Sequence, residues 1–187
     1  INKIIKKIKN KNKIINSAGL FDLKSVFYLI EKCNLFIGND AGYDNSSGWR
    51  NTAVGDSSLT DVGQGIGNTA VGQGAGAATE FADFNTFVGV RAGWDNNRNN
   101  NTSNANRNTY VGTLTGFSNR AGEDNVGMGA FSDYGASGQV GGDWTDGPGN
   151  STNRSRTTFI GAQSDAGNND VTMLGYSTRV DGQYGIA

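Results

Sequence analysis

The chain has 187 residues, of which 29 are glycine and one is proline, and it contains no histidine and a single cysteine. This composition excludes the usual Cys/His zinc sites, the Ser/His or Cys/His nucleophile pairs and any disulfide within the chain. The net charge of −1 conceals a change in composition: residues 1–33 hold eight Lys and two acids, whereas residues 34–187 hold eight Arg, no Lys and fifteen acids. We therefore predict a boundary near residue 34, and the acidic second region disfavours nucleic-acid binding.

Residues 1–33 are predicted to form a basic, partly helical stub. The run from Ile1 to Lys13 is basic, and no apolar stretch comes after it as in a signal peptide, so we interpret it as a solvated helix end. A helix is predicted from Asp22 to Cys33, with Asp22 as its cap. Its apolar residues recur at helical spacing, and Cys33 continues this face as an expected core residue. Ahead of the boundary, the chain is thus interpreted as a truncated piece of an α/β domain.

The segment Ile14–Gly42 resembles the carboxyl-terminal domain of heptosyltransferase-type glycosyltransferases. The match includes Asn39, Asp40 and Gly42, which correspond to the family's Asn-Asp-Ser-Gly turn at the sugar-nucleotide site. The resemblance implies a vestigial sugar-nucleotide turn and gives an alternative function, a fragment of such a transferase fused to the remainder of the chain. The family continues with a histidine that this chain lacks, so transferase activity is not expected. Because residues 36–42 fit both halves, we hypothesise a chimeric junction there.

From residue 34 onward, one five-residue phrase recurs along the chain. Its closest copies, written from first to last residue, are 51–55, 68–72, 85–89 and 108–112, with looser copies at 34–38, 125–129, 157–161 and 171–175. The glycines that close the copies at 38, 55, 72 and 89 are 17 residues apart. A fixed period of this length is typical of a solenoid, because one unit cannot bury its own apolar face. We predict a mainly β fold, a parallel β-roll of about eight short coils over residues 34–187.

Each copy is predicted to contribute one strand, a glycine bend, a second short strand of small residues and a polar turn. Since side chains alternate along a strand, the second and fourth positions share a face, which we expect to point inward. The leading asparagines are expected to stack into a ladder. The residues that define the repeat, and that we take as its structural binding positions, are Asn51, Val54, Gly55, Asn68, Val71, Gly72, Asn85, Val88, Gly89, Asn108, Val111 and Gly112.

The third position of the phrase holds an aromatic residue in several copies, namely Phe36, Phe87, Tyr110 and Phe159. If the second and fourth positions face inward, these aromatics form an exposed apolar stripe. Such a stripe, on a coil with a thin core, predicts lateral packing against identical chains. We expect a homotrimer.

The repeated Asn-Thr-Ala-Val-Gly-x-x-Ala-Gly pattern resembles the heads of trimeric autotransporter adhesins and the repeats of phage tail fibres. The resemblance covers residues 34–187 and implies a left-handed, trimeric β-roll displayed outside the cell, on its surface or on a virion. The coils are longer than is usual in adhesin heads, and the third-position aromatics also depart from that family. Ile1 and the partial copy at Tyr184–Ala187 lead us to expect a fragment of a longer protein.

Binding is expected in the turns, since loops on a rigid scaffold commonly carry it. Two insertions are predicted, at about 95–107 and 139–156, and Trp49, Trp94 and Trp144 lie in turns. An exposed indole stacks readily on sugar rings, whereas the alternative is that each Trp covers a coil edge or packs across the trimer. The glycine-rich strings at 63–67 and 72–76 are interpreted as turns and not phosphate loops, and Asp143 and Asp146 as solvated acids and not calcium ligands.

We therefore expect a non-enzymatic structural and adhesive repeat domain that binds a surface glycan or protein receptor, with no cofactor, no metal, no nucleic acid and no membrane segment. An ice-binding function is the remaining alternative, because flat threonine arrays on β-solenoids bind ice. It requires Thr52, Thr69, Thr86 and Thr109 to face outward, and their phase with the valines is predicted to place them inside.

Overall fold

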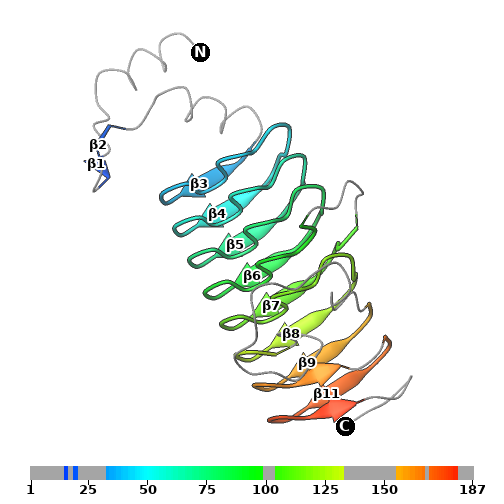
Figure 1. The fold of residues 1–187 in the computed structure, drawn as a ribbon. Coiled ribbons are helices and arrows are strands. Elements are labelled where there is room, and N and C mark those ends of the chain that lie inside the picture. Colours follow the sequence, from blue (N-terminus) through cyan, green and yellow to red (C-terminus); the bar gives the residue numbers. More distant parts are fainter. Residues whose placement is uncertain are drawn as a thin grey trace.

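A computed structural model describes residues 33–98, 104–132, 155–166 and 169–180, and the backbone of two short strands ahead of them. These two, β1 (Ile15–Asn16) and β2 (Gly19–Leu20), pair antiparallel. Within the described residues, eight parallel strands form one sheet along the length of the molecule (Figure 1). They are β3 (Leu35–Ile37), β4 (Thr52–Val54), β5 (Thr69–Val71), β6 (Thr86–Val88), β7 (Thr109–Val111), β8 (Val126–Met128), β9 (Thr158–Ile160) and β11 (Thr172–Leu174).

The strands are aligned residue for residue with their repeat neighbours. Thr52 lies opposite Thr69, and Thr69 lies opposite Thr86, with the same register continuing into β7. The register holds where the chain between two strands is longer, as between β6 and β7 or between β8 and β9. The predicted β-solenoid is therefore confirmed, and each strand is one rung about 4.8 Å from the next.

In most of the described coils the opposite side is made of stacked turns, and the predicted second strand forms in the last two described coils. Backbone hydrogen bonds still join coil to coil there: the Gly42 N–H donates to Ser58 O at 2.9 Å and the Leu59 N–H to Ala75 O at 3.0 Å. In the described residues this side has one isolated bridge, between Asp61 and Ala78, and one two-stranded piece, β10 (Asp165–Ala166) with β12 (Arg179–Val180). Ser57 and Leu59 adopt left-handed φ values of 53° and 45°, which interrupt the strand pleat.

The third position of each phrase points into the coil. Ala53, Ala70, Phe87, Tyr110 and Phe159 are fully buried, whereas Val71 and Val88 on the fourth position are exposed. The prediction that the threonines and valines face inward is therefore wrong, as is the predicted exposed stripe of aromatics. Alternation along a strand establishes which residues share a face, but it does not establish which of the two faces is inside.

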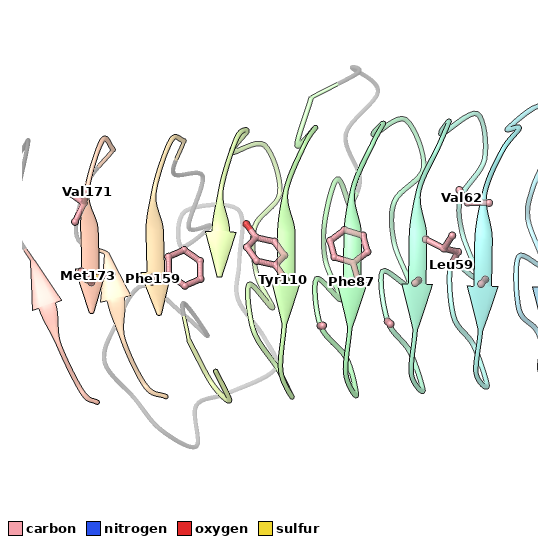
Figure 2. Close-up of a cluster of buried hydrophobic side chains, with 11 residues drawn as sticks. Leu59, Val62, Phe87, Tyr110, Phe159, Val171 and Met173 are labelled. Carbon is pink, nitrogen blue, oxygen red and sulfur yellow. The ribbon is translucent and has the colours of Figure 1, made fainter. Parts of the chain in front are cut away.

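The rings of Phe87 and Tyr110 fit inside the coil because the turn side has a glycine opposite each of them. A side chain at Gly93 would collide with the ring of Phe87, and one at Gly116 with the ring of Tyr110. The rings stack along the solenoid axis, with centroids 6.0 Å apart both for Phe87 and Tyr110 and for Tyr110 and Phe159 (Figure 2). The space at Gly127, on the rung between β7 and β9, is taken by the ring of Phe159. The core is thus a continuous column and not a series of separate coils.

The predictions for the amino-terminal segment have different outcomes. The helix predicted to begin at Asp22 lies outside the described residues up to Cys33, which is an exposed turn residue with φ 55° and not a core residue. Asn39, Asp40 and Gly42 form the corner of the first coil, where Gly42 leaves room for the Phe36 ring. The insertion predicted at 95–107 starts with buried residues, Asp95 to Asn97, and 139–154 lies outside the described residues.

Candidate functional site

The outward face of the eight-stranded sheet carries two straight files of side chains. The aliphatic file, from the fourth position of each phrase, is Ile37, Val54, Val71, Val88, Val111, Met128, Ile160 and Leu174. The threonine file, from the second position, is Thr52, Thr69, Thr86, Thr109, Thr158 and Thr172, with Leu35 and Val126 on the two remaining rungs. Exposure in the aliphatic file reaches 52% at Ile37 and 56% at Leu174. The sheet therefore presents a long, uncharged and partly apolar face to solvent.

The threonine hydroxyls on this face differ from those in the turns. Thr60 donates to Ser57 O at 2.7 Å, and Thr79 donates to Gly76 O at 2.6 Å. No threonine of the threonine file has a side-chain hydrogen bond to another group in the described part of the chain. These hydroxyls are available to water or to a molecule that covers the face.

A ladder of buried asparagines holds the beginning of each rung. Asn51, Asn68 and Asn85 are fully buried, and each side-chain oxygen accepts a bond from the backbone N–H of the equivalent residue one coil on, at 2.9–3.0 Å. Each side-chain amide donates to a backbone carbonyl in the turn just before the next leading asparagine. Asn51 donates to Gly65 O at 2.7 Å, and Asn68 donates to Ala82 O at 2.8 Å. The ladder predicted from the sequence is confirmed, and its role is structural.

The glycine that closes each phrase allows one coil to lie directly against the next. Gly72 has φ +133°, and a Cβ there would lie 2.5 Å from Gly89 O. Gly55, Gly89 and Gly112 repeat this geometry. Any side chain at these positions is strained and also collides with backbone, so the glycines set the close spacing of the rungs.

The outward face has two different edges. We name the residue that precedes each leading asparagine or its equivalent the entry rim: Cys33, Arg50, Gly67, Phe84, Arg107, Asp124, Arg156 and Asp170, all with left-handed φ. The residue that comes after each closing glycine forms the exit rim: Asn39, Asp56, Gln73, Val90, Thr113, Ala130, Ala162 and Tyr176. Sequence analysis missed both rims, because neither has one residue type that repeats.

Ion pairs run along the second half of the entry rim. The Arg107 guanidinium contacts Asp124 and Glu123, both at 2.6 Å, and Arg156 contacts Asp170 at 2.6 Å. Hydrogen bonds from Arg107 lower the pKa of Asp124, and those from Arg156 lower the pKa of Asp170. All these groups are exposed or half-exposed to solvent, so the pairs align neighbouring coils with only a small stabilisation each.

The two predicted ligand-facing tryptophans that the structure describes have different surroundings. Trp94 is half-buried, lies over Gly74 and stacks on Phe117 with centroids 6.3 Å apart, so it covers a coil edge as in the alternative interpretation. Trp49 is exposed, and the Arg50 guanidinium lies 4.3 Å from its ring centroid. Trp144 lies outside the described residues. Trp94 therefore packs within the solenoid, whereas Trp49 is exposed beside Arg50.

A small acidic group lies on the turn side of the coil. Burial, and then the charge of Asp44, raises the pKa of Asp61, while burial followed by the charges of Asp61 and Asp44 raises the pKa of Glu80. Within the described ranges, no three acidic or cysteine side chains are grouped closely enough to hold a metal ion. The same part of the chain contains no helix with the length and apolar character of a membrane span.

Comparison with protein-family models, with curated proteins and with solved structures finds no match to this chain. The fold itself defines the class: a β-solenoid repeat domain, whose extended uncharged surface is its outward sheet face.

Proposed function

We propose that the chain is a non-enzymatic structural and adhesive repeat domain of a trimeric surface adhesin or tail fibre, displayed outside the cell or on a virion. The observation that carries this proposal is the aliphatic file. All eight of its residues are apolar, and five of them, Ile37, Met128, Ile160, Leu174 and Val71, are at least 39% exposed. A contiguous apolar stripe of this length on a protein surface normally marks an interface.

The covering molecule in this proposal is a second and a third copy of the chain. Three flat sheet faces close around a common axis, with the aliphatic files at the centre and the threonine files beside them. The interface thus replaces the one predicted from the third-position aromatics, which are buried in the coil. Symmetry then presents every turn three times, so that weak contacts of the turns with a glycan or protein receptor gain avidity.

Light scattering on the full chain tests the assembly. We expect three times the chain mass of 19.7 kDa, and a lower mass with unchanged circular dichroism for Val71→Asp with Val88→Asp on the aliphatic file. Gln64→Glu, which adds a charge at an exposed turn position away from the sheet, is the matched control and should remain trimeric. A monomeric wild-type chain contradicts the proposal, and a trimer that tolerates both aspartates places the interface elsewhere.

A second candidate function, ice binding, is favoured by the outward threonine file and its unbonded hydroxyls. Regularly spaced hydroxyl and methyl groups are the chemistry that orders water into an ice-like layer. The uniform Thr-x-Val part spans β4 to β7, whereas bulkier residues such as Met128 and Ile160 interrupt the flat surface beyond it. This function requires a monomer with an open face, and an ice-recrystallisation assay with Thr69→Tyr as the disrupting variant separates it from the trimer.

A further inference from the structure

On two rungs, those of β4 and β6, the two rims of the sheet face carry residues of complementary chemistry. On the rung of β4, the entry rim has Arg50 and the exit rim has Asp56, which are of opposite charge and exposed. On the rung of β6, the entry rim has Phe84, 62% exposed, and the exit rim has Val90, 44% exposed. Both pairs match in chemistry, and neither pair can meet within one chain. Five residues lie between the rims, three of them in the strand, so the backbones of the rims are up to about 20 Å apart.

Arg50 has no carboxylate partner in the described part of the chain. Its guanidinium stacks on its own Trp49, whereas Arg107 and Arg156 each contact an acid on the next coil. The Asp56 carboxylate accepts one hydrogen bond, from the Ser57 hydroxyl at 3.2 Å, and has no cationic partner in the same described residues. This rung therefore leaves one charge of each sign at opposite edges of the face.

Three further rungs, those of β7, β8 and β9, show the converse pattern. Where the entry rim carries a charge that is paired within the chain, at Arg107, Asp124 and Arg156, the exit rim of the same rung has an uncharged residue, respectively Thr113, Ala130 and Ala162. No rung in the described ranges sets like charges against each other across the face. The complementarity of the rims therefore rests on the rungs of β4 and β6, and the other described rungs do not oppose it.

We infer that the entry rim of each chain lies along the exit rim of the next copy, parallel and in register. Arg50 pairs with Asp56 of the neighbouring copy, and Phe84 packs on Val90 of the neighbouring copy. A rotation axis parallel to the solenoid brings every entry rim against an exit rim on the same rung, whereas an antiparallel arrangement reverses the order of the rungs. This inference rests on the proposed assembly through the sheet face and adds its orientation and register.

Disulfide trapping in the full chain tests the register. Cys33 is exposed and free, so it is first replaced by Ser. In this background, Arg50→Cys with Asp56→Cys is expected to give covalent trimers on mild oxidation, because the two cysteines of one chain are too far apart to bond to each other. Arg107→Cys with Asp56→Cys is the matched control. Its cysteines lie three rungs apart, about 14 Å along the axis even between copies, and should not cross-link.

Charge reversal gives an independent readout. Arg50→Glu and Asp56→Arg are each expected to weaken trimer association about tenfold, and the double reversal to restore it to within about threefold of the wild type. Trimers that neither cross-link through the 50/56 pair nor recover in the double variant overturn the rim pairing while leaving the proposed function intact. A wild-type chain that is monomeric by light scattering overturns both.

Discussion

Coils with alanine at the third position and coils with an aromatic ring there fill the same interior in opposite ways. In the coil of β4, Ala53 is small and Leu59 enters from the turn side, fully buried (Figure 2). In the coil of β6, Phe87 enters from the sheet side and the turn side has Gly93. The coil of β5 is small on both sides, with Ala70 and Gly76, and a Cβ at Gly76 would lie 2.5 Å from Phe87 and 2.9 Å from Leu59. Volume is therefore balanced between neighbouring coils, as expected when each repeat is stabilised by the next.

The largest effect is expected from removing a ring on which two coils depend. Phe87→Ala should lower the free energy of unfolding by about 4 kcal/mol, because Phe87 is fully buried and fills the space at both Gly76 and Gly93. Urea unfolding followed by circular dichroism measures the loss. Tyr43→Ala, which truncates an aromatic ring that is 72% exposed, is the control and should change the stability little. A loss below about 1 kcal/mol for Phe87→Ala would mean that each coil fills its own interior without a ring from its neighbour.

Moving the large side chain from the sheet side of the coil to the turn side tests the same comparison between the two kinds of coil. Gly93→Leu alone should cost about 3 kcal/mol, since the new side chain collides with the Phe87 ring. Leu59 occupies the equivalent position with a φ of 45°, so the backbone of this corner accepts leucine. The double variant Phe87→Ala with Gly93→Leu, which copies the coil of β4, should therefore be more stable than the sum of the two single losses by at least about 1.5 kcal/mol. If the two losses simply add in a double-mutant cycle, the predicted compensation between positions 87 and 93 is wrong.

The asparagine ladder should respond alike in both kinds of coil. Asn68→Ala, on an alanine coil, and Asn85→Ala, on an aromatic coil, should each cost about 2 kcal/mol, because each leaves a buried N–H of the next coil without its acceptor. Urea unfolding of the two variants side by side measures this. Costs that differ by more than about 1 kcal/mol would show that the core, and not the ladder, determines the alignment of the rungs.

The smallest effect is expected at Asp61, on the turn side of the coil of β4. Burial and Asp44 raise its pKa in the folded chain, so the folded state holds the proton more tightly than the unfolded state. The contribution of Asp61 to stability is then complete below its ordinary pKa of 3.8 and is lost as the pH rises through the raised value. Asp61→Asn should stabilise the chain at neutral pH by less than about 1 kcal/mol, because solvent screens this half-exposed group. The gain should vanish near pH 3, which thermal unfolding at both pH values measures; Asp40→Asn, at an exposed position outside the proposed interface, is the control.

The sequence predicted the period, the strands and the asparagine ladder, because these depend on the spacing of Asn51, Asn68 and Asn85 alone. It did not predict which face is inside. That depends on the partner wall: Phe87 is accommodated only because Gly93 stands six residues further on, and this pairing becomes clear once the coil is closed. The same pairing of Phe36 with Gly42 and of Tyr110 with Gly116 is present in the sequence and would have given the correct face. The rims were beyond prediction, since Arg50 and Asp56 are related only through the flat face between them.

The asparagine ladder joins rungs that are neighbours in space, whatever the number of residues between them. The backbone N–H of Asn108 bonds to Asn85 at 2.9 Å over a step of 23 residues, as that of Asn68 does to Asn51 over a step of 17. The N–H of Thr157 bonds to Asn125 at 3.0 Å over a step of 32 residues. Turns of this solenoid can thus lengthen and diverge freely in evolution while the rod keeps its pitch, and foreign peptides grafted into them should be carried on a scaffold of unchanged geometry.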